Sequence, residues 1–400
     1  MNKKTANSPA RSLMPRVYRL RIVQVGLGIV IGLTASAALF AVRPREVAVA
    51  PAAPRTLLSD CDGAIGELVV HYTADGAAAI EPIYHEFVRQ LPDDVLVHVV
   101  CPSAADFDRL SSSLGNQGGR LAPLVVDHPI TCWSRDRWLA VELSRSTAGQ
   151  PVVELCPPRG EQTTSAWAAR RGDGLTAGDL AAALAPEVSV EPSELFFDGG
   201  DFVADDETVF VTPAVLQRNR QVTVDDREEL LVRLGNLVGR RVVLLDEAPP
   251  HHAGMFMMPV GNRTMLVADP AAAKPFLASV PDDVLGLPGG ADFSAATQAL
   301  FDAVADQCGR AGYRVIRIPA APAADGRTYL TYVNGILDQR QGRRIVYMPT
   351  FSAVPQLNAA ATAVWQQVGY EVRPIPCDSC YQHYGTLRCL VNVLRRGDSK

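Results

Sequence analysis

The feature that most constrains the fold is a regular alternation, from Glu67 onward, between short apolar runs and longer amphipathic stretches. The short runs are rich in β-branched residues, as strands are, whereas the longer stretches repeat apolar residues with the helical period. The expected strands are 68–72, 95–100, 124–127, 152–155, 209–211, 242–245, 265–268, 315–318, 345–348 and 372–375. The expected helices are 78–90, 104–114, 225–237, 294–311 and 355–368. This order predicts an α/β architecture, although the pattern does not give the order of the strands.

Composition favours one folded body behind a distinct N-terminal region. The chain has 400 residues, of which 48% are hydrophobic and 20% charged, enough for a large core. No long low-complexity tract follows residue 60, so we expect a single domain over 61–400. The polar, turn-rich stretch 149–178 is expected to be an irregular insertion or surface loop.

The N-terminal region has the pattern of a membrane segment. Residues 22–42 carry no charge over 21 positions, and roughly 20 apolar residues suffice to cross a bilayer. Six basic residues precede this segment, which predicts a basic cytoplasmic leader over 1–21 and a body outside the cytoplasm. The segment is interpreted as an anchor in the cytoplasmic membrane or, if cleaved near Ala48-Val49-Ala50, as the signal peptide of a secreted protein. The Pro/Ala-rich stretch 43–60 is expected to be a linker.

Charge is distributed unevenly between the leader and the body. Eight of the 38 Lys and Arg residues lie within the first 45 positions, so 30 basic residues face 43 acidic ones in the rest of the chain. An acidic body argues against nucleic acid as a partner. It is compatible with a small cationic substrate, although it also serves solubility.

The chain has eight cysteines, and export would favour pairing of some of them. Cys377 and Cys380 form a lone CxxC without a second pair or a histidine at zinc spacing. A local disulfide that supports the loop of Cys389 is therefore favoured over a metal site.

Two polar stretches stand out at the ends of expected strands. In the first, Cys132–Trp138, Asp136 lies between two arginines and two tryptophans. It is either one partner of a surface ion pair or a carboxylate that holds a planar cation beside an aromatic wall. In the second, Asp198-Gly199-Gly200-Asp201 forms either a plain hairpin turn or a turn that something must approach closely.

Two further stretches carry histidine and asparagine. His251-His252 follows two prolines and leads into apolar sequence, so at least one histidine is expected near the core, in a structural or a catalytic role. Adjacent histidines point apart on a strand and lack a third ligand at a familiar spacing, which disfavours a metal site. Asn334-Gly335 is first of all a hairpin signal.

The last stretch, YQHYGTLRCLVNVL over 381–394, places Cys389 between Gly385 and a β-branched run. A thiol on a short buried segment behind a glycine turn can be fixed in position and still be reached by substrate. A packing cysteine or a half-cystine would have the same local sequence.

The order of these stretches is more specific than any one of them. WSRD at 133–136, DGGD at 198–201, HHAGMFM at 251–257, TYVNG at 331–335 and GTLRC at 385–389 follow one another at sensible intervals. This order resembles the guanidino-group-modifying enzymes of the pentein superfamily, particularly the branch of agmatine deiminase and bacterial peptidylarginine deiminase. The similarity runs from roughly 68 to 395. It implies a pentein-type, fivefold pseudo-symmetric α/β propeller with a site at its central axis.

The resemblance also implies roles for individual residues. Cys389 is expected to be the nucleophile, His252 the general acid/base, and Asp198 a catalytic carboxylate that orients the histidine or contacts substrate. Asp136 is expected to bind the guanidinium, with Trp133 and Asn334 as further substrate-binding residues. The implied reaction is hydrolytic release of ammonia from agmatine, arginine or peptidyl-arginine through a cysteine-bound amidino intermediate, without a metal or organic cofactor.

The sequence departs from that pattern at two positions. The family has aspartate two positions after the histidine, where this chain has Gly254, and it often has histidine where this chain has Arg388. Loss of the second carboxylate removes a charge-assisted contact to the guanidinium. The alternative hypothesis is therefore a catalytically silent pentein that binds a ligand or partner.

Overall fold

The structure is a computed structural model that describes residues 55–143, 152–160 and 168–397. They belong to a folded unit that spans Ala53–Lys400. The expected leader 1–21, the membrane segment 22–42 and most of the linker 43–60 lie outside the described residues. In the described part of the chain, no helix has both the length and the apolar character needed to cross a membrane.

Five sheets in the described part of the chain share one plan. A first strand runs antiparallel to a second, and a helical connection then leads to a third strand parallel to the second. We call each unit a module and name it after its first strand: β19, β5, β8, β11 or β16. None of these described sheets closes on itself into a barrel.

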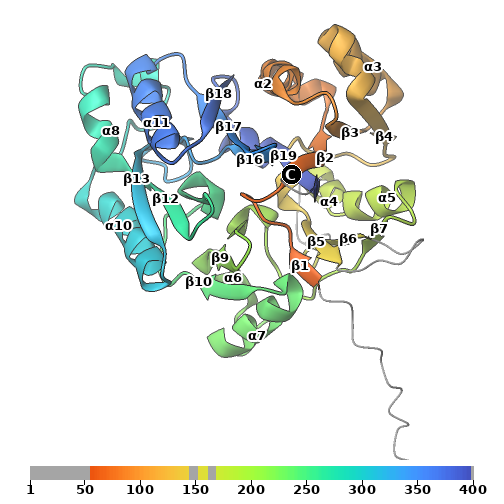
Figure 1. Cartoon of the computed structure of the whole chain (residues 1–400), viewed down its shortest axis with the longest axis horizontal. Helices are drawn as coiled ribbons and strands as arrows, with labels where there is room; N and C mark the ends of the chain where they lie inside the picture. Colours follow the sequence, from red (N-terminus) through yellow and green to blue (C-terminus); the bar gives the residue numbers. More distant parts are fainter. Residues whose placement is uncertain (1–54, 144–151, 161–167, 398–400) are drawn as a thin grey trace, which may run out of the picture. The chain divides into compact units, whose positions relative to one another are not determined.

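The modules take their strands from successive parts of the chain, with two exceptions: the β19 module joins the C-terminal strand to the N-terminal part, and the β5 module includes β1 from the start of the described chain (Figure 1). The β19 module contains β19 (Val391–Gly397), β2 (Ala64–His71), α2 (Ala77–Gln90), β3 (Leu96–Cys101), α3 (Ala104–Leu114) and β4 (Leu121–Val125). The β5 module contains β1 (Arg55–Leu57), β5 (Leu139–Leu143), β6 (Val153–Cys156), α4 (Ala168–Asp173), α5 (Thr176–Ala183) and β7 (Val188–Val190). The β8 module contains β8 (Phe202–Ala204), β9 (Thr208–Val211), α6 (Pro213–Asn219), α7 (Arg227–Val238) and β10 (Arg241–Leu244).

The remaining two modules follow the same plan. The β11 module contains β11 (Met257–Pro259), β12 (Thr264–Asp269), α8 (Pro270–Leu277), α9 (Asp282–Leu285), α10 (Ala295–Arg310) and β13 (Arg314–Pro319). The β16 module contains β16 (Ile336–Arg340), β17 (Arg343–Thr350), α11 (Pro355–Gln367) and β18 (Glu371–Pro376). A two-stranded ribbon, β14 (Ala321–Pro322) and β15 (Tyr329–Leu330), lies between them in sequence. Short helical turns are η1 (Ala74–Gly76), η2 (Gly115–Arg120), η3 (Ser134–Asp136), η4 (Gly199–Asp201), η5 (Ala253–Met255), η6 (Tyr381–His383) and α12 (Leu387–Leu390).

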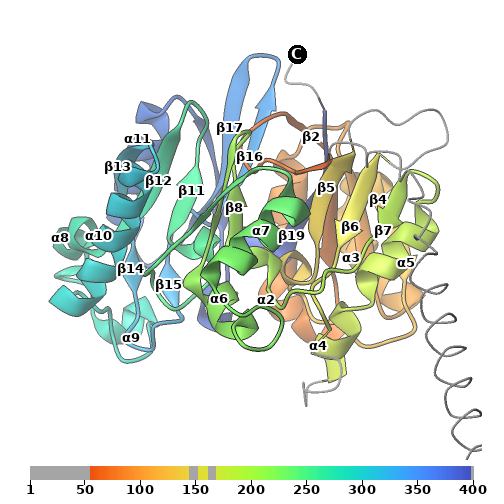
Figure 2. The ribbon, with the colours of Figure 1, turned by 90° about the horizontal axis from the view of Figure 1, so that it is seen from below.

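Burial explains why the second strands were predictable. Strands such as β9 and β12 are covered on both faces, so they are continuous apolar runs rather than alternating ones. Helices pack against them, as α5 does against β6 and β7 in Figure 2. The predicted α/β architecture is confirmed, and all ten expected strands and five expected helices have counterparts in the structure.

Helix boundaries follow from capping residues. The Ser294 side chain accepts a hydrogen bond from the backbone of Thr297 and begins α10. Asp226 caps α7 in the same way, and α7 ends at Gly239, whose φ of 60° is left-handed. A left-handed residue after the last turn is a common helix stop, because glycine adopts it without steric cost.

The two ends of the described chain meet in one sheet. β19 pairs antiparallel with β2, with Val391 opposite Val70. The Asn392 side chain donates to the carbonyl oxygens of Ser134 at 3.3 Å and Trp138 at 3.2 Å, which ties β19 to the WSRD loop. The C-terminal strand therefore holds the WSRD loop against the rest of the fold.

Two stretches differ from expectation. Residues 55–60, expected as the end of the linker, belong to the fold, since β1 pairs with β5 and Asp60 bonds Arg388 at 2.8 Å. In the stretch 149–178, expected to be irregular, the described residues include β6, α4 and the start of α5. α4 is rich in polar residues, which is why the sequence indicated an irregular stretch. Its polar side chains bind partners inside the protein, as Arg170 and Asp173 do.

The cysteines also differ from expectation. All eight lie in the described ranges and all are free, so the expected Cys377–Cys380 disulfide is not formed. The Cys380 thiol instead donates to the carbonyl oxygen of Gly385 at 3.4 Å. The CxxC segment thus supports the loop before Cys389 through a hydrogen bond rather than a covalent link.

Candidate active site

The five polar stretches occupy equivalent places in the five modules. Each stretch directly precedes the first strand of its module: WSRD precedes β5, DGGD precedes β8, HHAGM precedes β11, YVNG precedes β16 and GTLRC precedes β19. The turns η3, η4 and η5 formed by three of them contact one another in series, and α12 contacts η3. Residues more than 250 positions apart therefore reach one site because the modules repeat one plan.

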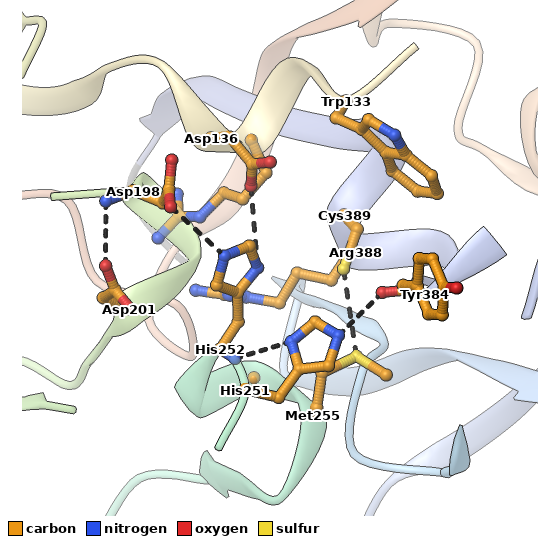
Figure 3. Close-up of polar contacts among 12 residues, drawn as sticks. Trp133, Asp136, Asp198, Asp201, His251, His252, Met255, Tyr384, Arg388 and Cys389 are labelled. Atoms are coloured by element: carbon orange, nitrogen blue, oxygen red, sulfur yellow. Dashed lines mark hydrogen bonds and ion pairs between the residues drawn. The ribbon is translucent and has the colours of Figure 1, made fainter. Parts of the chain in front are cut away.

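Cys389 lies on the single turn of α12, with Thr386 at its N-terminal cap. Its Sγ atom is 3.5 Å from Asn334 Oδ1 and 3.9 Å from Met255 Sδ, and 5% of the residue is exposed (Figure 3). The Asn334 amide also accepts the Thr386 hydroxyl at 2.7 Å and donates to the Gly254 carbonyl at 3.1 Å. Asn334 thus links the loop of the thiol to the loop of the histidines.

Trp133 closes the site beside the thiol (Figure 3). Its ring packs on Gly385, where an added Cβ would lie 2.6 Å from the ring and 3.0 Å from Cys389 Cβ. Any larger residue at 385 would push the indole or the thiol away. The turn glycine noted in the sequence is therefore required by close packing.

His252 points between the two carboxylates expected in the site (Figure 3). Its Nδ1 is 3.6 Å from Asp136 Oδ1, and its Nε2 is 3.7 Å from Asp198 Oδ2. The ring lies on Gly200, since a Cβ there would be 2.4 Å from Nδ1. The second glycine of DGGD is thus needed to admit the imidazole.

The surroundings keep His252 protonated. Burial by itself lowers its pKa, but Asp136, Asp198, Cys389 and Asp201 together raise the pKa well above the usual value. An imidazolium held between carboxylates can donate a proton at neutral pH.

His251 has the opposite character and orients its neighbour. Its Nδ1 accepts the backbone N–H of His252 at 2.7 Å, which assigns the proton to Nε2, 2.9 Å from the Tyr384 carbonyl oxygen. Burial, together with the charge of His252, lowers the pKa of His251 to about 3. One histidine of the pair is therefore neutral and structural, and the other is charged and faces the site.

Asp198 is engaged by the protein's own cations. Arg218 Nη1 donates to it at 2.8 Å and Arg170 Nη2 at 3.3 Å. Burial raises the pKa of Asp198, but the hydrogen bond to His252 and the charges of His252 and both arginines outweigh it and hold the pKa well below the usual range. Asp198 is therefore a carboxylate at neutral pH.

Asp136, the expected guanidinium anchor, already holds a guanidinium. Arg170 Nη2 donates to Asp136 Oδ2 at 2.6 Å, while Arg170 Nη1 lies 3.5 Å from Asp173 Oδ2. Asp136 Oδ1 has no hydrogen-bond partner in the described part of the chain and faces His252 Nδ1. The side chain of Arg170 is 16% exposed, so the contact is largely shielded from water.

The space beside Gly254 is filled by a cation. A Cβ at this position would lie 2.7 Å from Arg388 Nη1 and 3.3 Å from Asn334 Nδ2. Arg388 in turn bonds Asp60 and the Phe202 carbonyl oxygen at 2.9 Å. Neither Asp246 nor Asp269 supplies a substitute carboxylate: Asp246 is 70% exposed and pairs with Arg227, and Asp269 caps α8.

Comparisons with known proteins identify the fold. No family model matches the sequence, and the search of curated proteins finds no match. Among solved structures, agmatine deiminase from C. jejuni matches with a TM-score of 0.63 at 13% identity, covering 84% of this chain and 96% of that one. Agmatine deiminase from Enterococcus faecalis matches with a TM-score of 0.63 at 12% identity, covering 86% and 98%. A Porphyromonas gingivalis protein of proposed arginine deiminase activity matches with a TM-score of 0.64 at 19% identity, covering 84% and 97%.

The chain has the fold of the pentein-superfamily deiminases. The resemblance stated from the five motifs is thereby confirmed at the level of fold. The six residues expected in the site are all near one another in this fold, whereas their roles remain predictions.

Several residues of this pentein site were not found from the sequence. Arg170 lies in an AARRGD segment that resembles any polar surface helix, and Arg218 lies on α6 with no motif around it. His251 was noted only as one of two histidines. Its hydrogen bonds distinguish it, and these depend on Tyr384, which is far away in sequence.

A cleft of about 480 Å³ leads to this part of the pentein fold. Its lining residues are Asp198, Asp201, Ala214, Gln217, Arg218, Pro250, His251, His252, Arg327 and Tyr384. The cleft is large enough for a small organic molecule or a side chain of a peptide. Its inner wall carries both the charged and the neutral histidine.

Proposed function

We propose that the protein is a deiminase-type C–N hydrolase that acts on a guanidino compound such as agmatine, arginine or peptidyl-arginine. The observation that carries this proposal is the convergence of Cys389, His252, Asp136 and Asp198 from four separate loops. We further propose that the five modules form a fivefold pseudo-symmetric propeller with these loops around its axis.

The chemistry follows from the groups present. The Cys389 thiolate attacks the guanidinium carbon and forms a C–S bond, giving a tetrahedral adduct. His252 donates its proton to the departing nitrogen, the C–N bond breaks and ammonia leaves, so an S-linked amidino intermediate remains. Water then gives one proton to His252 and adds as hydroxide to the same carbon. The C–S bond breaks while the hydroxyl proton passes to solvent, so the neutral ureido product leaves and the thiolate is restored.

The substrate has to compete with an internal guanidinium. Arg170 pairs with both Asp136 and Asp198. A cationic substrate therefore has to displace Arg170 from Asp136 or use Oδ1, which faces His252 and accepts no hydrogen bond from the described residues. Because a charge-assisted pair in a shielded site is strong, the displacement costs binding affinity.

A second candidate function, a catalytically silent pentein that binds a ligand or partner, is favoured by the opposite side of the site. Gly254 supplies no carboxylate, and Arg388 places a cation there. A site with arginines at both anchor positions disfavours a cationic guanidinium. The thiol would then be a buried part of the fold that supports no turnover.

We also propose that residues 22–42 anchor the protein in the cytoplasmic membrane with the folded unit outside the cytoplasm. The support is the 21-residue uncharged segment behind six basic residues. Membrane fractionation and protease accessibility in spheroplasts test it. Recovery of the whole protein in the protected cytoplasmic fraction would overturn it.

Product analysis tests the enzymatic proposal. The purified protein is incubated with agmatine, free arginine and arginine-containing peptides, and ammonia and ureido products are measured against a Cys389→Ala control. We expect release from at least one substrate and none from the control. No ammonia from any substrate, while Cys389 still reacts with iodoacetamide, would overturn the proposal. Guanidine binding that is unchanged in Cys389→Ala would then support the silent alternative.

A further inference from the structure

A second, much smaller cavity lies next to Arg388. Its volume is about 20 Å³, and its polar lining consists of Ser59, Asp60, Arg135, Arg388 and Arg396. The remaining walls are apolar side chains of β1, β5, β16 and β19 and of Leu58. A cavity of this size holds one water-sized particle and excludes sulfate, phosphate or an organic acid.

The charges around this cavity do not balance. Three guanidinium groups face it, whereas Asp60 alone among its described lining residues carries a carboxylate. Asp60 is already paired with Arg388, at 2.8 Å from Nη2 and 3.2 Å from Nε. The positive charges of Arg135 and Arg396 are therefore left without a carboxylate in the cavity wall.

The other partners of these two arginines are neutral. Arg135 Nη1 donates to Asn392 Oδ1 at 3.0 Å, and Arg396 Nη1 donates to the carbonyl oxygens of Gly63 and Leu337 at 2.9 Å. The Nε atoms of Arg135 and Arg396 are buried and have no hydrogen-bond partner in the described part of the chain. Two arginines that line the cavity thus each have a buried donor without a partner among the described residues.

The pKa values of Arg135 and Arg396 are both lowered. Burial, with the nearby charge of Arg388, lowers the pKa of Arg135 to about 10. Burial also lowers the pKa of Arg396, and the attraction of Asp60 and Asp338 only partly offsets it. A buried charge without a counterion is unfavourable, and a counterion in the cavity would remove that cost.

We propose that this cavity is a binding site for one small monovalent anion of the halide class, chloride in the cell, held between Arg135, Arg388 and Arg396. Size excludes larger anions, and the surplus of guanidinium groups favours an anion over water or a cation. The anion would also hold Arg388 in the position that faces Gly254. The anion site would thereby fix the guanidinium that occupies the place of the missing carboxylate in the candidate active site.

Crystals of the full chain grown or soaked in bromide test the proposal directly. Bromide replaces chloride and scatters anomalously, so we expect one anomalous peak between the three guanidinium groups. A wild-type crystal with water, or with no anomalous signal, at this position would overturn the proposal. The readout is independent of turnover, so it stands or fails separately from the proposed hydrolase activity.

Thermal unfolding provides the test in solution. In buffers of constant ionic strength in which chloride replaces gluconate, we expect the Tm of the wild-type protein to rise saturably, by roughly 3 °C at ten times the dissociation constant. Arg396→Gln should lose most of this response. Arg395→Gln, the matched control on the same strand, removes a surface partner of Glu187 and should keep it. Equal Tm values in chloride and gluconate for the wild type, or an unchanged response in Arg396→Gln, would count against an anion site.

Discussion

The two halves of the candidate site differ in whether their reactive or charged groups are already paired with arginines of the protein. On the nucleophile side, Asn334, Thr386 and Trp133 hold Cys389 in place, and no arginine or lysine is bonded to its thiol among the described contacts. On the anchor side, Asp136 and Asp198 are paired with Arg170 and Arg218. The thiol is thus held in place without an arginine or lysine partner among the described contacts, whereas both carboxylates already have arginine partners within the protein.

The difference teaches that intact motifs do not guarantee an open binding site. The nucleophile side depends on residues within or next to the five motifs. The anchor side depends on arginines from α4 and α6, which belong to no motif. Variants that separate the two halves are therefore the most informative.

Removal of the thiol should have the largest effect. Cys389→Ala takes away the only group in the proposed mechanism that bonds to carbon, so we expect ammonia release to fall by at least about 10³-fold. Cys101→Ala on β3 is the matched control, because Cys101 is buried away from the motifs, and it should keep activity within a few-fold. Comparable losses in both variants would place the effect in folding rather than chemistry.

Removal of the internal guanidinium should have the next largest effect, in the opposite direction. Arg170→Ala frees Asp136 and Asp198, so we expect agmatine or methylguanidine to bind about 10- to 100-fold more tightly, as expected for release of one charge-assisted pair. Isothermal titration calorimetry measures it. Arg170→Lys keeps the charge near Asp136 and should remain within a few-fold of the wild type. If Arg170→Ala binds no more tightly than Arg170→Lys, the anchor is not limited by this contact.

The coupling between the halves should appear in the titration of His252. Asp136→Asn removes the largest influence that raises the pKa of His252, so we expect this pKa to fall in a ¹⁵N NMR titration. The sign for stability follows: the raised pKa means that protonated His252 stabilises the fold fully below about pH 6.5 and that this contribution is lost as pH rises through the folded value. Asp302→Asn on α10, outside the site, should leave the titration unchanged.

Restoration of the missing carboxylate should have the smallest effect. In Gly254→Asp the new side chain begins 2.7 Å from Arg388 Nη1, so it should pair with Arg388 and leave KM within about threefold of the wild type. Gly254→Ala controls for bulk. Gly254→Asp combined with Arg388→His removes that partner, and only this double variant should lower KM for a guanidino substrate. A tenfold lower KM in the single variant would show that Arg388 does not compete.

Strand and helix positions were predictable where burial leaves a continuous or periodic apolar pattern, as in β9, β12 and α10. None of the five first strands was predicted: β8 and β11 have three residues each, and all five directly follow polar motifs. These short strands are what carry the motifs to a common site. The sequence therefore predicted which residues meet, through the resemblance, but not the local reason why they meet.

The limits of the sequence are clearest at Gly254 and Asp136. The absence of a carboxylate at 254 is visible in the sequence, but the Arg388 guanidinium that faces it depends on Asp60, which was expected in a linker. The occupant of Asp136 depends on α4, which was expected to be irregular. Both cases involve long-range ion pairs, which leave no periodic signal in the chain.

The pairing of β19 with β2 has a consequence for biosynthesis. More than 300 residues separate β2 from β19, the strand that pairs with its edge, so β2 is synthesised long before its partner. Cys389 lies immediately before β19. A prematurely terminated chain thus lacks the thiol and exposes an unpaired strand edge, which promotes aggregation. Synthesis of the strand that completes this sheet and gain of the nucleophile therefore occur together.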